Sequence, residues 1–188
     1  MEKTPQKKRR ERIVRIVAGA MAGLVVVGLL LYYVPWPQRI RIDGDAYRAD
    51  KNAGSDTSYT ISLDATRLHY LFQSDRLTGH VTIRPADGGD AVVDQDLDRK
   101  MSGIMDVEHP DTGDVVQYFY TSWTDFKSGN FDLILMSGLI STDGKTAFVS
   151  IDGKGAYVAP ASSEQDAETI TNEFGKVFAM DEWIAGLQ

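Results

Sequence analysis

The sequence of 188 residues contains no cysteine. This absence excludes a disulfide scaffold, a thiolate site for zinc or an iron–sulfur cluster, a cysteine nucleophile and a lipid anchor on cysteine. The Gly-x-Ser-x-Gly, His-Glu-x-x-His, Ser-x-x-Lys and phosphate-loop motifs of enzymes are also missing. We therefore predict no catalytic residue and no cofactor. A hydrolase built from residues distant in the sequence is the alternative.

Positive charge is scarce beyond the first 15 residues. Those residues hold seven basic and two acidic side chains, a net charge of +5. The whole chain carries −7, so the other 173 residues carry −12. Nucleic-acid binding requires basic groups that displace counterions from phosphates. The acidic body therefore argues against nucleic acid as a partner.

A stretch without charged residues, 16–37, follows the basic tail, and residues 16–34 are almost wholly apolar. As a helix, 19 residues would span roughly 28 Å, close to the ~30 Å hydrocarbon thickness of a bilayer. Pro35 should end this helix because proline lacks the amide hydrogen. Aromatic residues that favour the membrane–water interface gather at its far end, namely Tyr32, Tyr33 and Trp36.

These features predict an uncleaved single-pass membrane anchor. Residues 1–15 would form a basic cytoplasmic tail, 16–37 the transmembrane helix with its interface, and 39–188 an extracytoplasmic domain. The alternative is a cleaved signal peptide, but its apolar run is usually only about 7–15 residues and precedes a small-x-small site. Because basic flanks stay in the cytoplasm, we expect the C-terminal domain outside the cell membrane, with the lipid bilayer as a partner.

Gly19 and Gly23 form a Gly-x-x-x-Gly pair within the apolar run. Small residues at this spacing let two membrane helices approach closely, which makes a homodimer through the helix a hypothesis. Glycine is also common in membrane helices that do not associate, and this is the alternative.

Residues 39–188 show hydrophobic periods of two rather than 3.6, which indicate strands. We predict a mainly β domain, a sandwich or partial barrel of eight to nine antiparallel strands. Residues 44–58 read as a loop, and 115–123 and 131–140 read as central strands covered on both faces. The alternating runs are 59–64, 67–72, 77–84, 91–94, 104–108, 115–123, 131–140 and 146–152.

One amphipathic helix should follow the strands. Ser162 and Ser163 are good N-cap residues, and acidic residues come directly after them. We expect Gly175 to stop the helix. Its apolar face would contain Ala167, Ile170, Thr171 and Phe174. A last segment should pack back onto the sheet through Phe178, Trp183, Ile184 and Leu187.

A hairpin joining 67–72 to 77–84 would place His69 opposite His80, if the apolar residues of both runs share one face. Opposed Cβ atoms lie about 4.5–5.5 Å apart, so the two imidazoles could ligate a metal ion with a third ligand. Two partly solvated histidines without a role are the alternative. Asp94, Asp96 and Asp98 are spaced like calcium ligands, but Arg99 stands where an EF-hand loop needs glycine.

Trp123 and Phe126 lie near a predicted turn in an aromatic-rich segment. If exposed, they would form a surface for a glycan or small ligand, whereas core packing is the usual fate of aromatic residues in strands.

A single anchor, a short cytoplasmic tail and missing catalytic motifs favour a protein that acts by contact. We expect an accessory or regulatory subunit of another envelope protein, with a glycan or small-ligand module and a hydrolase as alternatives. The architecture resembles that of single-pass envelope proteins of Gram-positive bacteria.

Overall fold

The computed structural model describes residues 5–49, 58–98, 100–127 and 130–178. The chain divides into two compact units. One contains the N-terminal part up to Trp36 together with Tyr70–Gln73, and the other contains Pro37–His69 and the chain from Ser74 onward.

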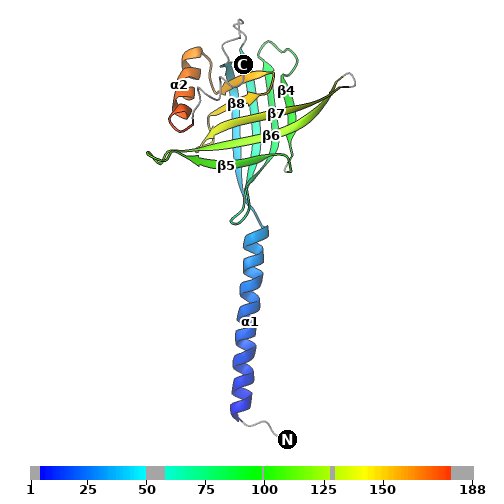
Figure 1. Ribbon diagram of the computed structural model, residues 1–188, viewed down its shortest axis with the longest axis vertical. Coiled ribbons are helices and arrows are strands. Elements are labelled where there is room, and N and C mark those ends of the chain that lie inside the picture. Colours follow the sequence, from blue (N-terminus) through cyan, green and yellow to red (C-terminus); the bar gives the residue numbers. More distant parts are fainter. Residues whose placement is uncertain (1–4, 50–57, 99, 128–129, 179–188) are drawn as a thin grey trace. The chain divides into compact units, whose positions relative to one another are not determined.

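Helix α1 spans Pro5–Tyr33 (Figure 1). It begins within the basic tail because lysine and arginine are good helix formers, and it ends before Pro35 as predicted. Its segment Arg9–Tyr33 is long and apolar enough to cross a membrane. The large apolar side chains from Ile13 to Leu30 are more than half exposed. An uncovered helix that is apolar on all sides fits a membrane anchor.

The second unit is an antiparallel barrel. Eight strands close it in the order β1, β2, β3, β5, β6, β7, β8, β9, and β4 pairs with β3 outside the closed ring. The mainly β prediction is confirmed, in the form of a closed barrel plus one strand. The strands are β1 (Trp36–Arg48), β2 (Tyr59–His69), β3 (Arg76–Pro85), β4 (Val93–Leu97), β5 (Gly103–Glu108), β6 (Val115–Lys127), β7 (Asn130–Ser141), β8 (Ala147–Ile151) and β9 (Gly155–Ala159).

Two strands have no counterpart among the predicted runs. β1 covers residues 44–48, which the polar composition had assigned to a loop, and β9 follows the Asp152-Gly153 turn. β1 places only a few apolar residues inside the barrel, among them Ile40, Ile42 and Ala46. Its local pattern is therefore weak, and pairing with β2 and β9 supplies the stabilisation that the pattern lacks.

Side chains fill the interior of the barrel. Successive residues of a strand point to opposite faces, so alternate residues line the inside. An eight-stranded barrel is just wide enough for its own side chains, and here the interior forms one apolar core. Its members include Ile61, Leu63, Leu77, Val81, Ile83, Phe119, Met136, Ile140, Val149 and Tyr157.

Helix α2 (Glu164–Gly175) covers one part of the outside. The Ser163 side chain caps it by accepting a hydrogen bond from the Asp166 amide, as predicted. Gly175 is its last residue, but the capping Lys176 has an ordinary right-handed φ of −70°, so the stop does not use a left-handed glycine. Trp183, Ile184 and Leu187 lie outside the described residues.

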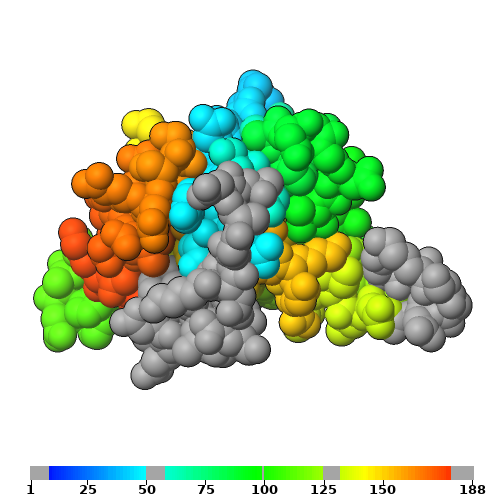
Figure 2. Space-filling model, turned by 90° about the horizontal axis from the view of Figure 1, so that it is seen from above, coloured from blue at the N-terminus to red at the C-terminus, as the bar shows by residue number. Residues whose placement is uncertain are grey.

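β8 and β9 are therefore the strands buried on both faces. Val149 and Tyr157 face the inner core, whereas Phe148 and Val158 lie beneath α2 against its Phe174. The prediction that 115–123 and 131–140 are covered on both sides was wrong, because much of the outside of β6 and β7 is exposed. Figure 2 shows α2 (orange to red) and the β6–β7 hairpin (yellow-green) on opposite sides of the view.

Candidate functional site

Four large apolar side chains form an exposed patch on the outer surface of β5, β6 and β7, which we name the open face. Their exposed fractions run from 41 % for Tyr120 to 61 % for Leu133. The members of the open face are Met105, Tyr120, Leu133 and Leu135. Scattered exposed apolar residues are normal, but a contiguous group marks an interaction surface.

Strand register makes the open face continuous. Tyr120 pairs with Gly103 on β5 and with Ser137 on β7. Met105 and Leu135 are its diagonal neighbours, within about 7–8 Å and in reach of an aromatic ring. A Cβ at Gly103 would lie 2.6 Å from the Tyr120 ring, so this ring lies directly over Gly103 and would have to shift if a larger residue stood there. Tyr120 thus lies over Gly103 at the centre of the patch.

Further along β6 and β7, the same outward side of the barrel is covered by α2 and the residues that follow it. Leu139 lies on the outward side of β7, as Leu135 does, but it is fully buried under α2. Tyr118 stacks on Phe178, with ring centroids 6.0 Å apart and an interplanar angle of 6°. The open face therefore begins where the covering residues end.

The structure describes the side-chain surroundings of only one of the two aromatic residues singled out from the sequence. Trp123 is half-buried and packs against the interior core. The side chain of Phe126 lies outside the described residues. The open-face residues were missed because apolar residues on both sides of β6 and β7 were read as complete burial. The sequence feature that could have identified them is the alternation in β7, where the outward Leu133 and Leu135 alternate with the inward-facing Ile134 and Met136.

The predicted histidine pair does not form, because the hairpin register differs. β2 and β3 pair Leu68 with Arg76 and Asp64 with His80. The predicted register placed Leu68, Tyr70 and Phe72 on the inward face of the hairpin. β2 instead keeps the alternation of Ile61 and Leu63 and ends at His69. The two histidines are therefore separated along the hairpin and cannot share one metal ion.

Arg67 occupies the inward position that this alternation creates, and its side chain is only 7 % exposed. Its guanidinium binds both carboxylate oxygens of Asp106, at 2.7 and 2.9 Å, and forms an ion pair with the buried Asp75. The hydrogen bonds to Asp106, and then those to Asp75, raise the pKa of Arg67 against the effect of burial. His69 lies 3.0 Å from Asp75 through Nδ1. These contacts compensate the buried charge of Arg67.

His80 lies between two carboxylates on β4. Its Nδ1 is 2.8 Å from Asp96 and its Nε2 is 2.7 Å from Asp94. The hydrogen bond to Asp96, followed by that to Asp94, raises the pKa of His80, and the bond to His80 lowers the pKa of Asp94. Both ring nitrogens can donate only in the imidazolium form. Among the described residues, no group of three or more His, Asp or Glu side chains has metal-site geometry.

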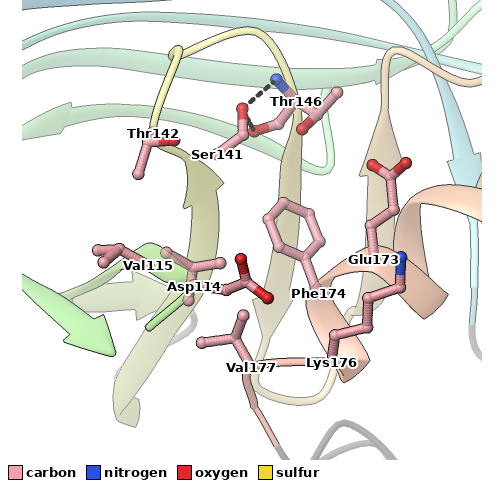
Figure 3. A pocket seen from close by; sticks show the side chains of 10 residues that line it. Asp114, Val115, Ser141, Thr142, Thr146, Glu173, Phe174, Lys176 and Val177 are labelled. Carbon is pink, nitrogen blue, oxygen red and sulfur yellow. Dashed lines mark hydrogen bonds between the residues drawn. The ribbon is translucent and has the colours of Figure 1, made fainter. Parts of the chain in front are cut away.

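A shallow pocket of about 220 Å³ lies beside the end of α2. Figure 3 shows the Asp114 carboxylate and the Phe174 ring pointing into it. It is smaller than the ~300–1,000 Å³ of common ligand sites. No histidine appears among the described residues that line it, which are Asp114, Val115, Val116, Ser141, Thr142, Thr146, Glu173, Phe174, Lys176 and Val177.

Gly19 and Gly23 both face open space, since a Cβ built at either position meets no atom within 4 Å. This geometry leaves room for a second helix. The homodimer stays a prediction.

The fold and the site define a class: a closed antiparallel β barrel with an apolar open face, joined to a long apolar N-terminal helix. Comparison with family models, with curated proteins and with solved structures gives no match.

Proposed function

We propose that this protein is a single-pass anchored accessory or regulatory subunit whose barrel binds the extracytoplasmic domain of another envelope protein through the open face. α1 would hold the barrel at the membrane, with the basic N-terminus in the cytoplasm. The observation that carries the proposal is the exposure of Met105, Tyr120, Leu133 and Leu135 as one group.

The chemistry of the open face suits a protein partner. It offers a tyrosine and a methionine, which are enriched in protein interfaces, beside two leucines. The Tyr120 ring lies over Gly103, and a tyrosine offers a large contact area with few rotatable bonds to be ordered on binding. No charge has to be desolvated at these four positions. Trp123, one of the two residues expected to form a glycan platform, packs against the interior core instead.

Photocrosslinking from intact membranes tests the proposal. A photoreactive amino acid would replace Tyr120 in the full chain, and the matched control would carry it at Glu168, an exposed residue of α2. We expect a crosslink to one membrane protein from position 120 and none from position 168. The double substitution Leu133→Ser and Leu135→Ser should lower the crosslinked yield about tenfold, as loss of interface hot spots does.

Two results would count against this function. Equal crosslinking from positions 120 and 168 would show that the open face has no special affinity. A product made only of two copies of this chain would indicate self-association instead of an accessory role. In both cases the stability of each variant, measured by thermal unfolding, must match that of the unmodified chain.

A further inference from the structure

The connection between β2 and β3 carries two exposed apolar side chains that the barrel core does not use. Leu71 is 44 % exposed and Phe72 is 66 % exposed. Residues Tyr70–Gln73 belong to the same compact unit as α1. We name these four residues the β2–β3 loop.

The β2–β3 loop contacts the C-terminal end of α1 in two ways. The Phe72 ring stacks on Tyr32, with centroids 6.3 Å apart and an interplanar angle of 16°. Gln73 donates a hydrogen bond from Nε2 to the carbonyl oxygen of Tyr32, at 2.8 Å. The last four carbonyls of a helix lack partners within it. The loop therefore satisfies one of them.

This second contact matters most if the end of α1 lies in a membrane. An unpaired carbonyl is costly where water is scarce, so the amide of Gln73 would stabilise the helix end there. The rings of Tyr32 and Tyr33 pack edge to face, with their centroids 4.9 Å apart. Aromatic residues at such a helix end favour the membrane–water interface. Phe72 extends this group from a distant part of the sequence. Residues 70–74 contain no charge, so their entry into the interface would desolvate none.

We propose that the β2–β3 loop is a second, shallow membrane contact, with Leu71 and Phe72 entering the interfacial layer of the bilayer that α1 spans. The occupant of this surface is lipid, at the boundary between headgroups and acyl chains. Recognition is apolar, so it does not depend on anionic headgroups. This inference rests on the proposed anchor and adds to it a site outside the helix.

Spin-label depth measurements on the full chain in lipid vesicles test the inference. The chain has no cysteine, so a single introduced cysteine carries the only label. The test variant is Leu71→Cys, and Phe72→Cys repeats it at the neighbouring residue in case one variant folds poorly. Val26→Cys reports the middle of α1. The matched control is Ala86→Cys, which follows the opposite end of β3, about 33 Å away along the strand.

Collision rates with oxygen and with a water-soluble nickel complex give the depth of each label. We expect the label at position 71 to lie about 5–10 Å into the interface, as interfacial apolar groups do, with the same depth in neutral and in anionic vesicles. The label at position 86 should be aqueous and that at position 26 deep.

The outcomes separate the two proposals. If position 26 is deep while positions 71 and 72 are as aqueous as position 86, the loop contact is wrong and the anchor stands. If position 26 is itself aqueous, the anchor fails and the inference fails with it. A loop depth found only in anionic vesicles would show headgroup recognition and would overturn apolar insertion.

Discussion

The barrel has two outer faces that look alike in sequence and differ in structure. On β8 and β9 the outward residues Phe148 and Val158 are fully buried beneath α2. On β5 to β7 the outward residues of the open face are exposed. Both are apolar, so hydrophobicity alone does not decide which face is buried. The difference is whether the chain supplies its own cover.

The largest effect should separate Leu139 from Leu135, two outward leucines of the same strand. Leu139→Ala should lower the free energy of unfolding by about 2–5 kcal/mol, because it leaves a cavity under α2. Leu135→Ala should change it by no more than about 0.5 kcal/mol, as surface substitutions do. Urea denaturation of both variants measures the contrast. Equal losses would mean that the two faces are not different in burial.

A smaller loss in the free energy of unfolding should follow when α2, which covers β8 and β9, is destabilised. Ser163→Ala removes the side chain that accepts the Asp166 amide, and loss of such a cap costs about 1 kcal/mol. The matched control is Glu168→Ala, an exposed position within α2. Hydrogen exchange should become faster in α2 and in β8 in the first variant alone. Unchanged exchange in β8 would show that α2 does not protect the outward side of β8 and β9.

The smallest effect concerns His80, an exposed residue of β3 that lies between two carboxylates of β4. Its pKa is raised above 6.5 by the hydrogen bonds to Asp96 and Asp94. The stabilisation is therefore fully present below about pH 6.5 and is lost as the pH rises through the higher pKa of the folded state. We expect the melting temperature of His80→Gln to fall less than that of the unmodified chain between pH 6 and 8. A parallel decline in both would remove this role.

The buried charge of Arg67 explains why the predicted hairpin register was wrong. Arg67 continues the inward alternation of Ile61, Leu63 and Ala65, but its charge favoured an outward position. That choice shifted the expected hairpin register and brought His69 and His80 together. The structure resolves the conflict with Asp75 from the following turn and Asp106 from β5, 39 residues away in sequence. A partner so distant cannot be found from a local pattern.

The candidate site was foreseen only in part. The aromatic-rich segment was recognised, and β6 does supply Tyr120 at the centre of the open face. Trp123 of the same segment is not part of the open face, because it has the inward phase of Phe119 and Thr121. The phase of a strand follows from its pairing partners, and Leu133 and Leu135 become a surface only because α2 lies elsewhere.

The sequence alone determined the features that depend on neighbouring residues: the apolar character of α1, its end before Pro35, the cap of α2 at Ser163, and the predominance of antiparallel strands. These follow from side-chain polarity, backbone hydrogen bonding and the period of two. Only the tertiary structure decided that the strands close into a barrel, that Arg67 is buried, and that one apolar outer face is covered while the other is open. Those outcomes depend on contacts between residues far apart in the chain, whose energies no local pattern contains.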